Sequence, residues 1–376
     1  MQFFNRQRRR IGATDLACGA RMPERDDPRM MQAGMMHAAA AWSRMAGAQM
    51  ARALTARVLI ALALVTALTL GFALPGGVAA AKAQGLGVVT SIKPVHSLVA
   101  RVMAGVGEPY LIVRGASSPH NYALRPNDAK ALSEADLVFW IGSDLEPFLQ
   151  NSLQNLAPQA EVVTLQRVPG LRLLGFREAG PLAAENQPPS VASAVSAEET
   201  ESGIQGEIDP HVWLDPDNTA VLVAAISDSL SARDPANAAR YQANAAAYIQ
   251  QIQALTGELT RQLAPVADQP FVVFHDGFQY FEKRFNLRVV GSITVNPAVQ
   301  PGARRVDEIQ QRIRDLNASC IFSEPQFDTR RVRAASQDTG AKLGQLDPLG
   351  SKLDAGPGLY EALMRDIVGS LLTCLS

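Results

Sequence analysis

The residues with the most informative chemistry are histidines, because the chain of 376 residues has only five of them. Three share a context: His120 in GASSPHNY, His211 in DPHVWLDP and His275 in VVFHDGF follow strand-like or loop segments, where α/β proteins usually place ligand groups. Neutral imidazole is the commonest metal ligand, and three imidazoles with one oxygen donor suit tetrahedral Zn²⁺. These three histidines are therefore candidate zinc ligands. Asp347, in QLDPLG, is the best candidate for the oxygen donor, and a water is the alternative.

The two remaining histidines have simpler interpretations. His37 lies in an N-terminal stretch that we assign to a leader, and His96 begins a predicted helix in SIKPVHSL. We expect His96 to pack against or cap that helix instead of binding a ligand.

The first half of the body alternates strand-like runs with helical patterns. Apolar runs predict strands at 88–92, 110–113, 136–142 and 161–165, and periodic patterns predict helices at 96–104 and 127–135. This alternation predicts a parallel sheet with helices on its faces. Residues 177–208 interrupt the pattern with Pro, Ser, Ala and Glu, which indicates a mobile, acidic loop within this lobe.

A long helical segment follows. Asp234-Pro235 combines an N-capping residue with a proline at the first helical position, and the run rich in Ala, Gln, Leu and Glu continues to about Leu263. Apolar side chains recur at spacings of three and four along it: Tyr241, Ala245, Tyr248, Ile252, Leu255 and Leu259. The pattern predicts a rigid connecting helix over 234–264, about 45 Å long at about 1.5 Å per residue.

The remainder returns to the α/β pattern. Strands are predicted at 271–275, 289–294, 320–324 and 342–346, and helices at 277–285, 306–316 and 358–372. The predicted fold class is α/β: two α/β lobes, each with a parallel sheet flanked by helices, joined by one long rigid helix. The lobes are expected at 84–233 and 265–376, with the metal site in the cleft between them.

The N-terminus has the features of an export signal. The uncharged run VLIALALVTALTLGFAL at 58–74 follows Arg52 and Arg57, and an A-x-A pattern ends at Ala83. We predict a signal peptide over 50–83, cleaved after Ala83, in place of a membrane anchor. Residues 1–49 have no pattern that needs a core. We interpret them as an over-extended or disordered N-terminal extension, with Met45 or Met50 as the true start.

Charge and cysteine content narrow the class of protein further. Residues 84–376 carry 24 Lys and Arg against 32 Asp and Glu, so we expect no nucleic-acid partner. Of three cysteines, Cys18 lies in the leader and leaves Cys320 and Cys374 in the body. In an oxidising compartment such a pair is expected to form a disulfide, whereas two free thiols would fit a cytosolic protein.

Long segments of the chain resemble a known family. TSIKPVHSLVARVM, GASSPHNYALRPNDAKALSEADLVFWIG, DPHVWLDP, FVVFHDGFQYFEKRF, FSEPQF and QLDPLG are similar to the substrate-binding proteins of zinc ABC importers (the ZnuA type). The similarity runs from about residue 86 to the C-terminus, interrupted by the loop at 177–208. The resemblance implies a metal bound between two α/β lobes that one long helix joins.

The resemblance also implies site residues, a partner and a location. His120, His211 and His275 match the family's metal histidines, and Asp347 matches a carboxylate ligand of manganese- and iron-selective relatives. The family pattern supports a Cys320–Cys374 disulfide. The expected protein is a periplasmic monomer that delivers Zn²⁺ to a cognate ABC permease in the inner membrane.

Two departures from the family pattern and three alternative functions accompany the resemblance. The position before the first histidine, acidic in some zinc members, is Pro119, and the acidic loop lacks the histidines that many members carry there. A manganese or iron binder on the same fold is the main alternative; relatives of that type carry a carboxylate where His275 stands. A zinc enzyme would need an open coordination position and a general base such as Glu324. An adhesin-like role is disfavoured because no lipid-anchor cysteine follows the apolar run.

Overall fold

The computed structural model describes residues 85–177, 208–294, 297 and 303–376. The N-terminal extension, the signal peptide with its cleavage site, and nearly all of the acidic loop lie outside the described residues. Within the described ranges, no helix is long and apolar enough to cross a membrane.

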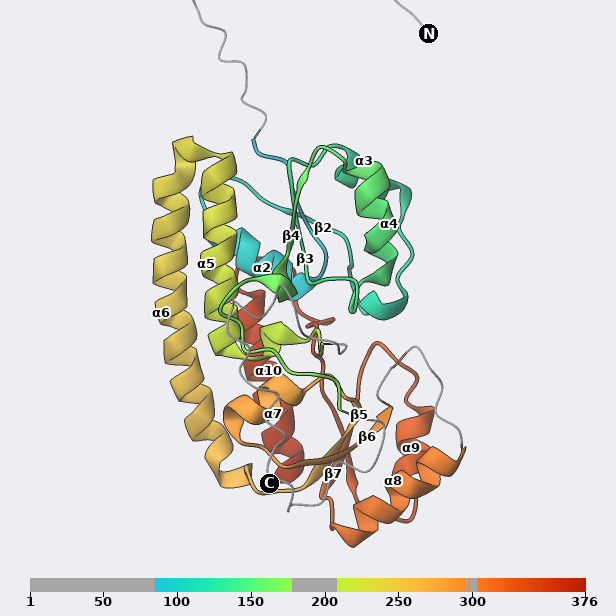
Figure 1. The fold of residues 1–376 in the computed structure, drawn as a ribbon. Helices are drawn as coiled ribbons and strands as arrows, with labels where there is room; N and C mark the ends of the chain where they lie inside the picture. The colour runs from blue at the N-terminus through green and yellow to red at the C-terminus, as the bar shows by residue number, and fades with distance from the viewer. Residues whose placement is uncertain (1–84, 178–207, 295–296, 298–302) are drawn as a thin grey trace, which may run out of the picture. The chain divides into compact units, whose positions relative to one another are not determined.

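The first sheet has four parallel strands in the order β2-β1-β3-β4. The strands are β1 Val88–Thr90, β2 Tyr110–Leu111, β3 Leu137–Trp140 and β4 Glu161–Thr164. Its helices are α2 Lys93–Val102, α3 Pro126–Ser133 and α4 Pro147–Leu156. Figure 1 shows α3 and α4 on one face of this sheet and α2 on the other. The central strands β1 and β3 are buried along their whole length, as the unbroken apolar runs require in a sheet covered on both faces.

The second sheet repeats this arrangement in the order β6-β5-β7-β8. The strands are β5 Phe271–His275, β6 Val289–Thr294, β7 Cys320–Ser323 and β8 Lys342–Gln345. Its helices are α7 Gln279–Phe285, α8 Ala303–Asp315, α9 Arg330–Ser336 and α10 Leu359–Leu375. In Figure 1, α8 and α9 cover one face while α7 and α10 cover the other. The two sheets confirm the predicted α/β fold class.

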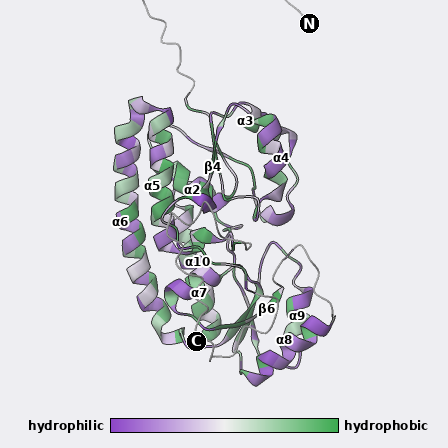
Figure 2. Cartoon of the chain, in the orientation of Figure 1, coloured by the Kyte–Doolittle hydropathy of each residue, from purple (hydrophilic) through white to green (hydrophobic). Residues whose placement is uncertain are grey.

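Two long antiparallel helices follow, α5 Pro216–Arg233 and α6 Ala238–Leu263. In Figure 1, α6 runs alongside both sheets, and α5 lies beside the first. Hydrophobic and hydrophilic residues alternate along them (Figure 2), and the predicted apolar stripe of α6 is buried. The N-cap of α6 is Asn237, three residues after the expected Asp234. Residues Pro235–Asn237 form a 3₁₀ turn, and the Asp234 carboxylate instead accepts hydrogen bonds from Asn237 and from the Tyr241 hydroxyl.

One hydrophobic core connects the elements of both sheets. It runs from the first sheet through α2, α5 and α6 to the inner face of the second sheet and α10, while a smaller core lies under α8 and α9. The expected disulfide is present: Cys320 in β7 and Cys374 in α10 are bonded, with 6.2 Å between their Cα atoms. It attaches the C-terminal helix to the second sheet.

Candidate metal centre

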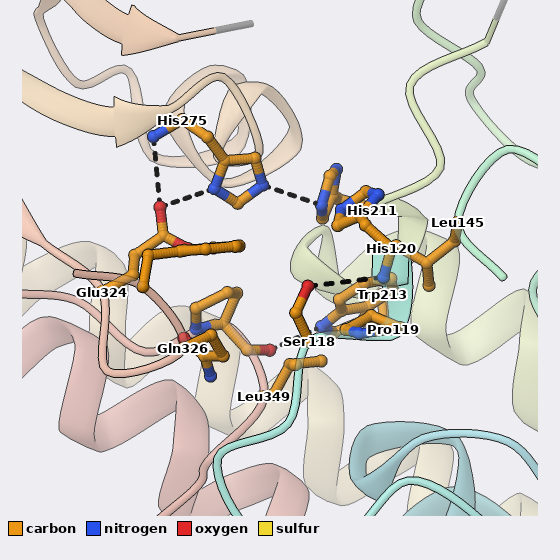
Figure 3. A pocket seen from close by; sticks show the side chains of 12 residues that line it. Ser118, Pro119, His120, Leu145, His211, Trp213, His275, Glu324, Gln326 and Leu349 are labelled. Carbon is orange, nitrogen blue, oxygen red and sulfur yellow. Dashed lines mark hydrogen bonds and ion pairs between the residues drawn. The ribbon is translucent and has the colours of Figure 1, made fainter. Parts of the chain in front are cut away.

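The three candidate histidines come together although they are 91 and 64 residues apart in the sequence. A ring nitrogen from each of His120, His211 and His275 lies within 4.8 Å of the others. The Nε2 atoms of His211 and His275 are 3.1 Å apart. Figure 3 shows the three rings turned toward a common point. Among the described residues, these three histidines are the cluster of potential ligand side chains (His, Cys, Asp or Glu) that is close enough to hold one metal ion.

Each histidine is placed by the end of a regular element or by a short turn. His275 is the last residue of β5, at the carboxyl end of the second sheet, and its side chain is buried. His120 lies in a 3₁₀ turn, Pro119–Asn121, whose N-cap Ser118 accepts a hydrogen bond from the His120 backbone N–H. His211 directly precedes a second 3₁₀ turn, Val212–Leu214. These positions agree with the rule that α/β proteins assemble ligand sites at strand ends and adjoining loops.

Two buried carboxylates orient two of the rings. Glu324 Oε1 lies 2.5 Å from His275 Nδ1 and also accepts from the His275 backbone N–H at 3.2 Å. Asp209 Oδ1 lies 2.7 Å from His211 Nδ1 and accepts from the His211 backbone N–H at 3.0 Å. A carboxylate on Nδ1 fixes the tautomer and leaves Nε2 with a lone pair. Both rings therefore present Nε2 to the shared space, as a metal would require.

The protonation of the histidines follows from their surroundings. Burial lowers the pKa of His120 and of His211 well below the ordinary histidine value, and the neighbouring rings add to the effect. Burial also acts to lower the pKa of His275, but the charge and hydrogen bond of Glu324 outweigh it and raise that pKa. Two rings are thus neutral and ready to bind at neutral pH, while at the third a metal must compete with a proton.

The space between the rings is small. It is lined by Ser118, Pro119, His120, Leu145, His211, Trp213, His275, Glu324, Gln326, Phe327, Pro348 and Leu349. Its free volume is about 10 Å³, about what one water molecule needs. Half of the lining residues are apolar or aromatic and surround the histidines: Pro119, Leu145, Trp213, Phe327, Pro348 and Leu349. The pocket therefore suits a single ion, with no room for an organic substrate.

Asp347, the expected oxygen donor, is not a member of the group whose ligand atoms lie within 4.8 Å. Its Oδ1 accepts hydrogen bonds from Gln326 Nε2 at 2.7 Å and from the Leu349 backbone N–H at 3.1 Å. Its Oδ2 accepts from the backbone N–H and the hydroxyl of Ser351. In this structure the carboxylate holds its own turn. His96 lies apart from the site, with Nε2 3.2 Å from the Pro109 carbonyl, which fits a packing role.

An ion cluster behind His275 was not foreseen from the sequence. Arg177 binds Asp276, the residue after His275, and Glu282 in α7. Burial raises the pKa of Glu282 to about 7, although Arg177 opposes the effect. Gln279 Nε2 donates to Asp209 Oδ2 at 3.1 Å. An isolated antiparallel bridge pairs Gly175 with Ile208, and the Gly175 carbonyl accepts a hydrogen bond from Gln279. The only sequence signals were the carboxylates next to His211 and His275.

Comparison with known proteins assigns the family. The model of the ZnuA family, described as the periplasmic zinc-uptake complex component A, matches residues 88–374. The chain belongs to this family. The high-affinity zinc uptake system protein ZnuA of Brucella suis biovar 1 is 45% identical over 306 residues, covering 77% of this chain and 92% of the relative. The protein of the same description from Paracoccus denitrificans is 33% identical over 319 residues, covering 82% and 98%.

Solved structures share the fold. A mutant of the laminin-binding adhesin Lmb from Streptococcus agalactiae has a TM-score of 0.62 at 25% identity, covering 78% of this chain and all of that one. The periplasmic zinc binding protein TroA from Treponema pallidum has a TM-score of 0.62 at 23% identity, covering 77% and 98%. The ZnuA family model and these two-lobe neighbours agree with the architecture of two sheets and a long pair of helices.

Proposed function

We propose that this chain binds one Zn²⁺ in the periplasm and delivers it to the permease of an ABC importer. The observation that carries the proposal is the convergence of three imidazoles in a pocket the size of an ion. Nε2 of His211, Nε2 of His275 and one ring nitrogen of His120 are the proposed ligands. The metal is cargo, so the protein has to hold it tightly and later release it.

The donor set supports zinc over manganese or iron. Three nitrogen donors suit Zn²⁺, whereas Mn²⁺ favours carboxylate and water oxygens. The fourth position falls to a water or to Asp347. To reach the metal, Asp347 would have to give up the hydrogen bonds that it accepts from Gln326, Leu349 and Ser351, which favours water.

A binding role also fits the pocket better than an enzymatic one. A catalytic zinc needs an open position, a substrate cavity and a free general base. The pocket has about 10 Å³ of free volume, and Glu324, the residue considered as a base, is hydrogen-bonded to His275. Family membership describes a substrate-binding transport component. We propose a monomer without enzymatic activity; metal-dependent hydrolysis of ester, phosphate or peptide substrates would contradict this.

Export is part of the proposal. We propose that residues 50–83 are a signal peptide removed after Ala83, and that the mature protein consists of lobes at 84–233 and 265–376 with a connecting helix over 234–264. The apolar run at 58–74 and the A-x-A pattern support it. N-terminal sequencing of the protein from a periplasmic extract tests it: a first residue other than Gln84 overturns the cleavage site.

Metal content and titration test the function. Protein purified from periplasm without added metal should carry about one zinc per chain, and His275→Ala should abolish most of the zinc affinity. His96→Ala is the matched control, because His96 is a partly buried histidine that lies outside the pocket. Preferential retention of Mn²⁺ under anaerobic competition, or equal effects of the two substitutions, would overturn the proposal.

A further inference from the structure

Lys93 is a buried cation that none of the proposed ligand chemistry uses. It is the first residue of α2, three residues beyond the end of β1, and only 7% of it is exposed. Its ammonium group donates to three backbone carbonyls, at 3.0 Å to Gly350, 3.0 Å to Ser351 and 2.8 Å to Leu353. A lysine has three N–H donors. All three are therefore satisfied by one turn, which lies more than 250 residues away in the sequence.

The same turn is held from other sides. The Asp347 carboxylate binds the backbone N–H of Leu349 and both the N–H and the hydroxyl of Ser351. Trp213 Nε1, from the segment that carries His211, donates to the Pro348 carbonyl at 3.0 Å. We term residues 347–353 the latch turn. Lys93 and Trp213, from outside the second sheet, bind four of its carbonyls, and Asp347 binds two of its N–H groups.

The backbone of the latch turn is shaped for this role. Gly350 has a φ of +65°, a left-handed conformation that disfavours residues with a Cβ. A Cβ at this position would lie 3.1 Å from the Leu353 side chain. The left-handed residue bends the chain so that the carbonyls of Gly350, Ser351 and Leu353 converge on a single point, where the Lys93 ammonium lies.

The latch turn forms one wall of the metal pocket. Pro348 and Leu349 line the pocket together with the histidines, and Figure 3 shows Leu349 on the side away from His275. If the turn moved away, Lys93 would lose all three of the carbonyls that satisfy its ammonium group. An unpaired buried ammonium is strongly unfavourable. Lys93 therefore opposes the movement that would open this side of the pocket to water or to a competing ligand.

We propose that Lys93 is a positioning residue that holds the latch turn over the metal pocket and so sets how fast zinc leaves. The inference rests on the proposed function, since it concerns release of the same ion. The ion does not contact Lys93; the effect passes through Pro348 and Leu349. Breaking the latch accelerates dissociation, while the three histidines still capture zinc at an almost unchanged rate.

The test is the zinc dissociation rate of Lys93→Met, measured by mixing zinc-loaded full-length mature protein with excess chelator. Trp213 provides the signal, because its ring centroid is 5.3 Å from that of His211. Methionine keeps much of the length and removes the charge. A lost hydrogen-bonded charge corresponds to a dissociation rate about tenfold or more higher, with the association rate within about twofold of wild type.

Ser97→Ala is the matched control. Ser97 lies one helical turn after Lys93 in α2, and its hydroxyl accepts a hydrogen bond from the Tyr360 backbone N–H, another long-range contact that does not involve the latch turn. Ser97→Ala should release zinc at the wild-type rate. A wild-type rate for Lys93→Met, or equal acceleration by both substitutions, overturns the proposal.

A second variant covers the case in which Lys93→Met does not fold. Ser351→Ala removes one hydrogen bond from the Asp347 side of the latch turn and should also accelerate dissociation; no change would overturn the proposal. If Lys93→Met folds, it can be combined with Ser351→Ala. This double variant should accelerate dissociation by less than the product of the two single effects, because both substitutions act on the latch turn. Wild-type protein that binds no zinc would refute the proposed function itself, a different outcome.

Discussion

The hydrogen bond between Glu324 and His275 offers a quantitative test of the metal centre. Glu324→Gln keeps the shape of the side chain and its acceptor oxygen but removes the charge. The carboxylate is 2% exposed and lies 2.5 Å from His275 Nδ1. Losing a carboxylate that orients a metal-binding histidine costs about 10- to 100-fold in affinity, or about 1.4 to 2.8 kcal/mol. We expect the zinc Kd of Glu324→Gln to rise by this factor at pH 8.

The pH dependence gives a second signature with a definite sign. Glu324 raises the pKa of His275 above the ordinary histidine value, so in the wild-type protein a proton competes with zinc as the pH falls through that raised pKa. Without the charge the pKa is lower, and the competition begins at a lower pH. The ratio of the variant Kd to the wild-type Kd should therefore shrink as the pH is lowered from 8 to 6.

Chelator-competition titrations at pH 6, 7 and 8 measure both effects. Glu282→Gln is the control, because Glu282 is also a buried carboxylate near the site but is bound to Arg177 instead of a histidine. Its zinc Kd should stay within about threefold of wild type, short of the smallest loss expected at Glu324. Equal Kd values for the wild type and Glu324→Gln at pH 8 would refute the reasoning, as would a ratio that grows as the pH falls.

Three further predictions concern stability and selectivity. Burial raises the pKa of Glu146 from 4.5 to about 7. Protonated Glu146 therefore stabilises the fold below about pH 4.5, and this stability is lost as the pH rises through 7. Glu146→Gln should stabilise the protein at pH 8 by up to about 3 kcal/mol; a stabilisation in urea unfolding that is no larger at pH 8 than at pH 5 would contradict this. Cys374→Ser opens a link across 54 residues and should lower the free energy of unfolding by about 4 kcal/mol, measured against wild type without reductant. His275→Asp replaces a nitrogen donor by oxygen and should shift the ratio of zinc to manganese affinity toward manganese; an unchanged ratio in competition dialysis would contradict it.

The sequence predicted those elements whose own residues determine them. β5 and β6 were expected at 271–275 and 289–294 and have these bounds, because short runs rich in β-branched and aromatic residues favour buried strands. The helices α4 and α9 were not foreseen. In α4 the run PFLQNSLQNL buries only Leu149 and Leu153, and α9 is a seven-residue, arginine-rich segment, so neither has enough apolar periodicity to indicate a helix.

The metal site, too, has parts that the sequence predicts and parts that it does not. The types and positions of His120, His211 and His275 were visible in the sequence, and the structure brings these three side chains together. The pairing of His275 with Glu324 spans 49 residues, and no local pattern encodes it. Whether Asp347 faces the metal or its own turn depends on a side-chain rotamer and on contacts made only after folding. Motifs identify candidate ligands, whereas tertiary packing determines which groups support them.

The shared hydrophobic core has a consequence for unfolding. A protein with two separate domains unfolds in two steps, each half melting around its own core. Here α2, α5, α6 and α10 contribute side chains to one cluster that reaches both sheets, so neither half retains a complete interior without the other. Calorimetry should therefore show a single cooperative transition, and a fragment ending between the sheets should fail to fold. Because the proposed zinc ligands come from both halves, zinc should raise the temperature of that one transition.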